Sequence, residues 1–308
     1  LVACGVWEAV TYVTASADHL ESFSDGEATG FLHRAHRDRL VKLKNPLQAD
    51  RSVLRPTLIP ALVEAVASNL KHADSVRLGE LARIYLPHPS SETMDGRPLE
   101  IEIAAVAIAG RRDAVGIYTQ AGDLDFFDLK GILHAVLSRL GLTVNVEPAA
   151  HAALHPGRAA SFSVEGIRIA LLGELRPDVA ARFGVDDARV TVAELDLSSI
   201  LPLTRRPREN ITVPRFLPVE QDFAIVVDEA TPADSVGRAL LESARPLATD
   251  AVLFDIYRGA QIGDGKKSLA YRVSFTAPDR ALTDAELVKV RSRIERTLKQ
   301  RVSGTLRS

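Results

Sequence analysis

Residues 222–228 read Asp-Phe-Ala-Ile-Val-Val-Asp and residues 231–234 read Thr-Pro-Ala-Asp, and these two stretches decide the fold of the C-terminal third. A short β-branched run of this kind is typical of a buried strand. A threonine N-cap, a proline at the first helical position and an acid in the first turn predict a helix that runs to about Arg245. A strand followed directly by a helix therefore opens this part of the chain.

The residues that follow extend the pattern to a small complete domain. Residues 251–257 predict a second strand, and residues 268–275 predict the strand that returns after a glycine-rich turn. Thr283 and Glu286 have the capping-box spacing before an apolar stripe with helical periodicity, which predicts a second helix. With a last short strand at 304–307, the order β-α-β-β-α-β indicates a ferredoxin-like domain.

The part of the chain before this domain shows more strand patterns than helix patterns, without the regular alternation of a doubly wound fold. Strands are expected at 7–14, 76–85, 101–108 and 167–172, and helices at 52–70 and 128–140. This pattern predicts an α+β fold with a mixed, largely antiparallel sheet and flanking helices. A polar, proline-containing stretch predicts a linker at 204–214, which separates a first domain at 1–203 from a second at 215–308.

Composition narrows the class of protein. The 308 residues suit two domains, and 46% hydrophobic and 25% charged residues are ordinary globular values. Cys4 is the single cysteine, which excludes a disulfide framework and fits a reducing cytoplasm. No run of eighteen apolar residues is present, so we expect no membrane partner. The start at Leu1, without a signal-peptide pattern, indicates a fragment of a longer chain.

Charge is distributed unevenly along the sequence. The net charge is −2, but from Arg205 onward 18 basic and 14 acidic residues give a net of +4. The C-terminal third is therefore the basic part, a weak indication of nucleic-acid binding.

Short motifs along nearly the whole chain resemble those of one family. They are Asn-Pro-Leu at 45–47, Leu-Arg-Pro-Thr-Leu-Ile-Pro at 54–60, Phe-Asp-Leu-Lys-Gly at 127–131, Leu-His-Pro-Gly-Arg-Ala-Ala at 154–160, Leu-Gly-Glu-Leu-Arg-Pro at 172–177, Phe-Asp-Ile-Tyr at 254–257, Lys-Ser-Leu-Ala at 267–270 and Asp-Arg-Ala-Leu-Thr-Asp-Ala-Glu at 279–286. In this order they resemble the C-terminal part of the beta subunit of bacterial phenylalanine–tRNA ligase. Gln221 departs from the family, in which arginine is common at this position.

The resemblance implies a noncatalytic, class II synthetase-like core that packs on the catalytic alpha subunit of an α2β2 heterotetramer. It implies that the second domain binds the anticodon region of phenylalanine tRNA. The complete cytoplasmic enzyme would use ATP and Mg²⁺ to attach phenylalanine to this tRNA. This chain itself would hold neither a cofactor nor a metal.

The residues themselves also argue against an adenylation site. Such a site of class II type needs arginines that point at the ATP phosphates. The strand at 76–85 supplies Arg83 without the acid that should follow, and 193–198 contains neither glycine nor arginine. Glu194 and Asp196 are instead expected to face the place of the triphosphate. We therefore expect no catalytic residue, and we interpret Arg83 as a surface side chain.

Other candidates are weaker. The stretch 265–268, Gly-Lys-Lys-Ser, lacks the spacing of a phosphate-binding loop and suits a hairpin turn. His155 precedes Pro-Gly without a second ligand at metal spacing, so a turn role is favoured. His33 and His36 are expected to be solvated, and Cys4 to be an unreactive thiol.

The positive signal lies in the second domain. Single-stranded bases are held by aromatic faces, edge hydrogen bonds and a cationic path. Tyr257 suits a stacking platform, with Asp255 as a base-edge acceptor and Ser268 on the adjacent strand. Candidate phosphate contacts are Arg238, Arg258, Lys266, Lys267, Arg272 and Arg307. The resemblance implies that Ala224, Arg238, Asp255, Tyr257, Ser268 and Arg307 meet the anticodon region. The charges of 289–301 are interpreted as a solvated helix face.

Two alternatives remain open from the residues. A single-chain synthetase with its own active site would need the two phosphate-binding arginines. A regulatory or scaffold protein whose ferredoxin-like module binds a small molecule would be stabilised by that ligand without tRNA.

Overall fold

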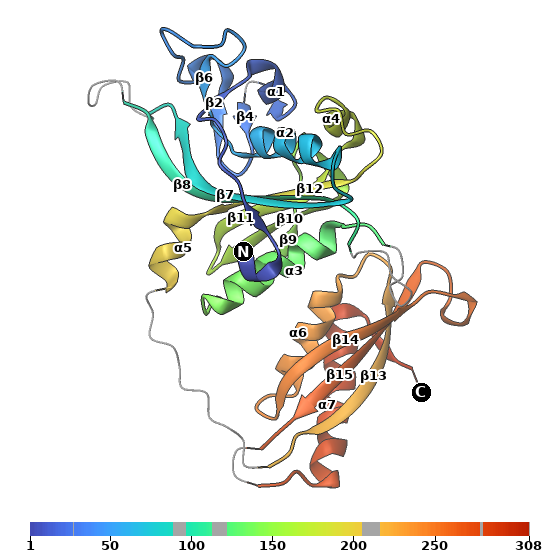
Figure 1. The fold of residues 1–308 in the computed structure, drawn as a ribbon. Helices are drawn as coiled ribbons and strands as arrows, with labels where there is room; N and C mark the ends of the chain where they lie inside the picture. The colour runs from blue at the N-terminus through green and yellow to red at the C-terminus, as the bar shows by residue number, and fades with distance from the viewer. Residues whose placement is uncertain (27, 89–96, 113–121, 205–215, 278–279, 308) are drawn as a thin grey trace. The chain divides into compact units, whose positions relative to one another are not determined.

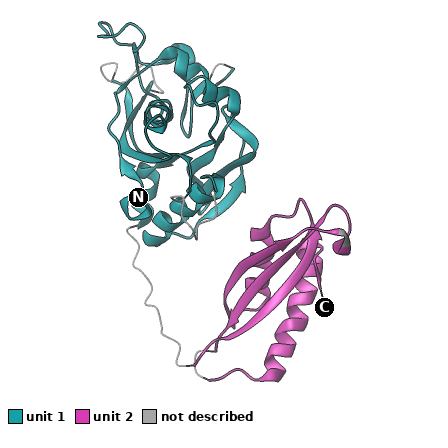
Figure 2. Cartoon of the chain, turned by 45° about the vertical axis from the view of Figure 1, so that its right-hand side comes forward, with its two compact units in different colours: residues 1–208 teal, residues 209–308 magenta. Residues whose placement is uncertain are grey.

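The computed structural model describes residues 1–26, 28–88, 97–112, 122–204, 216–277 and 280–307. The chain forms two units, Leu1–Arg208 and Glu209–Ser308 (Figures 1 and 2), and each is described by itself. The expected linker lies outside the described residues except for Thr204. Both units combine strands and helices, which confirms the predicted α+β class.

Unit 1 is built on a seven-stranded sheet with the order β1-β7-β8-β12-β11-β10-β9. The strands are β1 Trp7–Glu8, β7 Ser75–Leu86, β8 Leu99–Gly110, β9 Asn145–Pro148, β10 Leu154–Val164, β11 Ile167–Leu175 and β12 Val190–Asp196. Every neighbouring pair is antiparallel except β1 with β7. The predicted mixed, largely antiparallel sheet is therefore confirmed.

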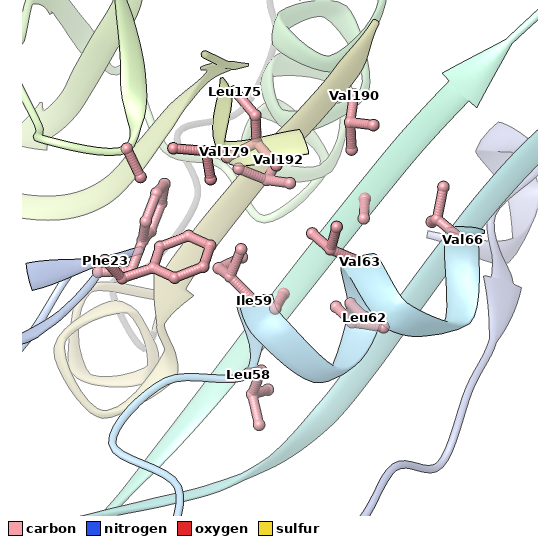
Figure 3. Packing of buried hydrophobic residues seen from close by; sticks show 14 of the residues in the cluster. Phe23, Leu58, Ile59, Leu62, Val63, Val66, Leu175, Val179, Val190 and Val192 are labelled. Carbon is pink, nitrogen blue, oxygen red and sulfur yellow. The ribbon is translucent and has the colours of Figure 1, made fainter. Parts of the chain in front are cut away.

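Helices cover both faces of this sheet (Figure 1). Helix α2 (Ile59–Leu70) lies on one face, with the short helices α1 (Ala17–Glu21) and α4 (Pro177–Ala181) on the same side, and α3 (Phe126–Arg139) and α5 (Leu197–Thr204) lie on the other. Alternate residues of β8 join two separate cores: Ala105 packs with α2, and Val106 packs with α3. Figure 3 shows the α2 side, where Ile59 and Val63 face Val192 of β12.

Two expected elements of unit 1 are wrong in their bounds. The strand expected at 7–14 divides into β1 and β2 (Thr14–Ala15), because the Glu80 carboxylate binds the backbone N–H (3.3 Å) and hydroxyl (2.6 Å) of Thr11 between them. The helix expected from 52 begins at Ile59, because β6 (Val53–Leu54) pairs with β2. A further small sheet consists of β3 (Ser24–Asp25), β4 (Ala28–Gly30) and β5 (Arg34–His36), and 3-10 turns form at η1 (Val2–Cys4) and η2 (Arg37–Arg39).

The two carboxylates of β12 serve the fold, which corrects the expectation that they face a triphosphate. Buried Glu194 accepts hydrogen bonds from Leu32 N (3.1 Å), Thr57 Oγ1 (2.6 Å) and Leu58 N (2.8 Å). Asp196 accepts hydrogen bonds from the backbone N–H (3.1 Å) and hydroxyl (2.7 Å) of Ser199 at the start of α5.

His33 is also placed differently from the expectation. Its Nε2 lies 3.2 Å from Asp196 Oδ2, and its side chain is only 28% exposed. The solvated position expected for His33 is therefore wrong, because the loop after β4 carries the ring to the end of β12. His36 is exposed, as expected.

Unit 2 has the predicted ferredoxin-like topology. Its elements are β13 Val219–Asp228, α6 Ala233–Ser243, β14 Ala248–Tyr257, η3 Ala260–Ile262, β15 Lys266–Phe275, α7 Asp284–Val302 and β16 Thr305–Leu306. The sheet order is β14-β15-β13-β16 with every neighbouring pair antiparallel. Both helices pack on one face, where Val236 of α6 and Ile294 of α7 join Ile225 in the core.

The two helix starts of unit 2 differ in how well they were predicted. The capping box is confirmed, because the Glu286 carboxylate accepts hydrogen bonds from Thr283 N (3.0 Å) and Thr283 Oγ1 (2.9 Å). The N-cap of α6 is Pro232 and not Thr231, without a side-chain cap. Instead, the Tyr271 hydroxyl of β15 donates to Ala233 O at 2.6 Å and ties the start of α6 to the sheet.

Replacing Glu194 tests the carboxylate that joins the segments of unit 1. Burial raises the pKa of Glu194, opposed in part by hydrogen bonds from Thr57, Leu32 and Leu58. A folded-state pKa above the ordinary 4.5 means that the wild type loses stability as the pH rises from 4.5 through the raised pKa. We expect Glu194→Gln, which cannot ionise and puts an amide N–H where an acceptor is needed, to be less stable than wild type by about 1–3 kcal/mol at pH 5. The difference in the free energy of unfolding between wild type and variant should become smaller as the pH approaches 8, because only the wild type loses stability over this range.

Urea unfolding followed by the fluorescence of Trp7, the single tryptophan, measures this difference in unit 1. Glu100→Gln, an exposed carboxylate on β8, is the matched control and should leave the midpoint within the usual scatter of surface changes. A difference that widens with rising pH would contradict the assigned direction of the pKa.

Candidate nucleic-acid interface

The predicted binding residues of unit 2 meet on the face of the sheet opposite α6 and α7. Within the described part of unit 2, neither helix covers this face (Figure 2). The strand register aligns Asp255 with Ala270 and Ala270 with Ala224. The next row aligns Tyr257 with Ser268. Four of the six predicted residues, Ala224, Asp255, Tyr257 and Ser268, therefore lie close together on β13, β14 and β15. Arg307, which follows β16, is the fifth residue on this face.

Arg307 reaches across the sheet to Tyr257. Its backbone N–H donates to Ala224 O on β13 at 2.8 Å, while its guanidinium lies 5.6 Å from the centre of the Tyr257 ring on β14. The guanidinium also donates to Gln261 Oε1 at 2.7 Å. Because β15 lies between β13 and β14, the Arg307 side chain crosses β15 near Ser268. Ser268 is only 5% exposed. A cation–π contact thus holds an aromatic ring and a cation side by side.

The chemistry of this face suits a planar, polar ligand. Small side chains at Ala224, Ala270 and Ser268 form the floor, and Tyr257 stands at its edge with 38% of its surface exposed. The exposed Asp255 carboxylate accepts a hydrogen bond from Ile256 N through Oδ1 (2.9 Å). An aromatic face, a carboxylate acceptor and a guanidinium donor are the groups that bind an unstacked base.

The other predicted cations are engaged within the protein. Arg258 forms a two-pronged pair with Glu229 (2.7 and 3.1 Å), and Lys267 Nζ donates to Glu229 O at 2.7 Å. Hydrogen bonding to the Arg258 guanidinium lowers the pKa of Glu229. Lys266 is exposed at the start of β15. Arg238 lies on α6, on the opposite side of the sheet, and pairs with Asp234 at 2.9 Å, so the structure does not bring it to Tyr257.

Sequence reasoning did not assign Phe254 to this face, and it named Arg272 only as a phosphate contact. Phe254 is 53% exposed, and the Arg272 guanidinium lies 5.3 Å from the centre of its ring. Arg272 also forms a bidentate pair with Asp222 (2.9 and 3.0 Å), and this pair lowers the pKa of Asp222. The strand register shifts between Leu253 and Asp255, so strict alternation does not place Phe254. No sequence signal marks this irregularity.

Candidates in unit 1 have structural roles. Arg83 is exposed and pairs with Glu100 (2.9 Å) and Glu102 (3.6 Å) of the adjacent strand, in agreement with a surface side chain. His155 Nδ1 accepts a hydrogen bond from Gly157 N at 3.2 Å, which is the expected turn role. Cys4 is a half-buried free thiol.

The described residues contain neither a metal-binding cluster nor a helix that could span a membrane. Within those ranges, no group of three or more His, Cys, Asp or Glu side chains is arranged to hold a metal ion. No described helix has the length and apolar character needed to span a membrane.

Two family models match the chain. The model of the phenylalanyl tRNA synthetase beta chain CLM domain matches residues 1–197, and that of the ferredoxin-fold anticodon binding domain matches residues 214–307.

Curated relatives agree with these models. A phenylalanine–tRNA ligase beta subunit from Moorella thermoacetica is 38% identical over 87% of this chain and 33% of its own length. One from Geobacillus kaustophilus is 33% identical over 100% of this chain and 37% of its own length. The chain thus spans about a third of the relatives that it matches. A solved pyrrolysyl tRNA synthetase from Desulfitobacterium hafniense, with a TM-score of 0.45, 13% identity and coverage of 65% of this chain and 61% of its own, is too distant to support an argument.

Gly259→Ala tests what holds the Tyr257 ring in place. A Cβ atom at Gly259 would lie 2.4 Å from the Tyr257 hydroxyl and 2.7 Å from Cζ, so the ring must move. We expect the ring to leave the Arg307 guanidinium while the unfolding midpoint changes little, because a half-exposed side chain can swing outward. Loss of the ring-current shift on the Arg307 side-chain protons in the NMR spectrum measures the movement. Tyr257→Phe keeps the ring and should retain the shift, and an unchanged Gly259→Ala spectrum would refute the steric argument.

Proposed function

Because the chain belongs to the family of phenylalanine–tRNA ligase beta subunits, we propose that it supports ATP-dependent attachment of phenylalanine to its tRNA without forming the adenylate itself. Unit 2 binds the anticodon region, and unit 1 packs on the catalytic alpha subunit of a cytoplasmic α2β2 enzyme. ATP and Mg²⁺ act in that partner and not on this chain. The observation that carries the proposal is the Tyr257–Arg307 stack beside Asp255.

The sheet face of unit 2 supports base recognition. Tyr257 offers a ring face, Arg307 is already held against that ring, and Asp255 offers an acceptor one row away. A base that stacks on Tyr257 loses little side-chain entropy, because the Gly259 contact and the Arg307 guanidinium already restrict the ring. Asp255 then selects bases with an amino or imino N–H at their edge. Ala224 and Ser268 act as the small floor and make room for the base.

Two observations in unit 1 support the absence of adenylation by this chain. Glu194 and Asp196 are engaged in hydrogen bonds with Leu58 N and Ser199 N, and neither supplies the cation that a triphosphate needs. Arg83 is paired with Glu100 on the sheet surface. These charged side chains of the synthetase-like core therefore stabilise unit 1 and are not available to bind ATP.

An apolar groove in unit 1 supports docking on the alpha subunit. A cavity of about 500 Å³ lies beside β1, α3 and α5, and its lining includes Trp7, Leu81, Leu140 and Leu201. Trp7 is 76% exposed and Leu81 is 60% exposed. Large apolar side chains gathered at one groove mark a surface that another protein covers.

Binding of labelled phenylalanine tRNA tests base recognition. In the double variant Tyr257→Ala, Asp255→Ala, we expect roughly tenfold weaker binding and loss of preference for the cognate anticodon, because a stacked base contributes about 1–3 kcal/mol. The measurement uses the chain at low and moderate salt, with a tRNA of another anticodon beside the cognate one.

Ile256→Ala is the matched control for this experiment. Ile256 is 44% exposed on the same strand, but it aligns with Leu269, whose side chain enters the helix-side core. If the wild type, the double variant and the control bind tRNA equally and without anticodon preference, base recognition is rejected. Binding would then be explained by a basic surface alone.

Leu81→Arg tests the docking groove. We expect it to weaken capture of the catalytic alpha subunit at least tenfold, since it buries a charge at the interface, while unit 1 stays folded because Leu81 is exposed. Capture by immobilised alpha subunit and a thermal melt of the variant measure the two effects.

Ile167→Arg is the control for docking, because Ile167 is 48% exposed in the β10–β11 hairpin and does not line the groove. Equal capture of the two variants would remove the support for the groove as the docking site.

A further inference from the structure

Three cations on one side of α7 stand out because they have no acidic partner. Lys289, Arg293 and Arg296 are spaced four and three residues apart, so they lie along one helix face. None of them forms an ion pair with a carboxylate of the residues that the structure describes. With Pro246, Leu247 and Val290 they line a cavity of about 470 Å³. We call these three side chains the α7 strip.

Several other cations of unit 2 are paired with acids, although Arg245, Lys266, Lys299 and Arg307 share the lack of an ion pair with a described carboxylate. Six of its arginines are paired with acids, namely Arg238 with Asp234, Arg258 with Glu229, Arg272 with Asp222, Arg280 with Glu286, Arg291 with Glu295 and Arg301 with Glu242. Two of these, Arg291 and Arg301, belong to α7 itself. Like charges three and four residues apart destabilise a helix, so the unpaired α7 strip costs free energy that a bound anion would recover.

The surroundings of the α7 strip favour an anion. Arg293 Nη2 donates to Arg245 O at 3.1 Å, so one guanidinium is held in position. Glu286 is the one acid among the residues that line the cavity, and both of its oxygens are bound by Arg280 (2.8 and 2.6 Å). Hydrogen bonding to Arg280 lowers the pKa of Glu286 to about 2. This carboxylate is therefore already neutralised by its own partner.

The dimensions of the α7 strip point to an extended anion. Lys289 and Arg296 are seven residues apart, which is about 10 Å along a helix axis. One phosphate ion is too short to bridge that length, whereas successive phosphates of a nucleic-acid strand extend along it. Guanidinium groups also match phosphate oxygens through paired hydrogen bonds. None of the described residues that line the cavity is aromatic, so they offer no stacking surface for a base.

We propose that the α7 strip binds backbone phosphates of the RNA, on the helix side of unit 2 and separate from the Tyr257 face. This inference rests on the proposed function, in which unit 2 binds tRNA. The two surfaces have different tasks: the Tyr257 face distinguishes bases, and the α7 strip adds affinity that is independent of sequence. The charged side chains expected to form a solvated helix face at 289–301 are exposed, and the proposal adds an RNA contact for the three that form the strip.

The test compares two triple variants of the full chain. The strip variant is Lys289→Gln, Arg293→Gln, Arg296→Gln, and the control is Arg291→Gln, Lys299→Gln, Arg301→Gln. Both remove three positive charges from exposed positions of the same helix. The probe is labelled phenylalanine tRNA, titrated over a range of salt concentrations beside a tRNA of another anticodon, with thermal melts of both variants.

We expect the strip variant to bind both tRNAs at least tenfold more weakly and to lower the slope of log affinity against log salt by about 2, as loss of two or three phosphate contacts requires. The control variant should change that slope by less than about 1. Strip and control variants with equal slopes would overturn the proposal. Binding of polyglutamate by the wild type as tightly as RNA would also overturn it, because the strip would then fit an acidic protein segment.

The same titration separates this inference from the proposed function. A Tyr257→Ala variant that loses anticodon preference but keeps the wild-type salt slope supports two separate surfaces. If that variant loses preference while the strip variant matches its control, base recognition stands and the α7 strip is rejected. A wild-type chain that binds no tRNA would reject both.

Discussion

The buried carboxylate of Glu194 is the constraint on which the rest of unit 1 depends. Helix α2 begins after Leu58, a residue whose side chain cannot cap a helix, and Glu194 supplies the missing acceptor from β12. The same carboxylate holds Leu32 N, so the small N-terminal sheets, α2 and the central strand meet at one group. A negative charge at a helix start is also favoured by the helix dipole. The arrangement uses a buried acid to join distant segments of the chain.

A buried ion pair between Arg55 and Glu80 also joins segments near the N-terminus of unit 1. Arg55 is 4% exposed and donates to Glu80 Oε1 at 3.0 Å, to Thr11 Oγ1 at 2.9 Å and to Arg83 O at 3.1 Å. Because a buried guanidinium needs several acceptors, this one side chain ties the segment between β1 and β2 to the residues just after β6 and to β7. Arg55 and Glu80 thus satisfy each other inside unit 1, while the apolar groove that includes Trp7 and Leu81 stays exposed.

In unit 2, intramolecular pairing decides which side chains are available for RNA. Glu229 occupies Arg258 and Lys267, and Asp222 occupies Arg272, so these cations contribute less to phosphate binding than their number suggests. Arg307 differs because its partners are the Tyr257 ring and the Gln261 side-chain amide, and not a carboxylate. A base could stack on the same ring or accept the hydrogen bond that Gln261 now accepts. In the function that we propose, the sheet face provides recognition that depends on the base, and the α7 strip provides binding that depends on charge.

The sequence alone determined the α+β class, the ferredoxin-like order of unit 2 and the grouping of Tyr257, Asp255 and Ser268, because periodicity, capping signals and family motifs act over a few residues or in order along the chain. Tertiary structure decided the rest. The contact of Arg307 with Tyr257, the irregular register at Phe254, the separation of Arg238 on α6 and the half-buried position of His33 beside Asp196 all depend on segments far apart in sequence. Likewise, the pairing of Arg301 with Glu242 is visible only after folding, whereas the four-residue spacing of Asp234 and Arg238 on a helix is visible in the sequence. Hydrogen bonds and ion pairs form between atoms that the fold brings within a few ångströms, and no local pattern encodes that distance.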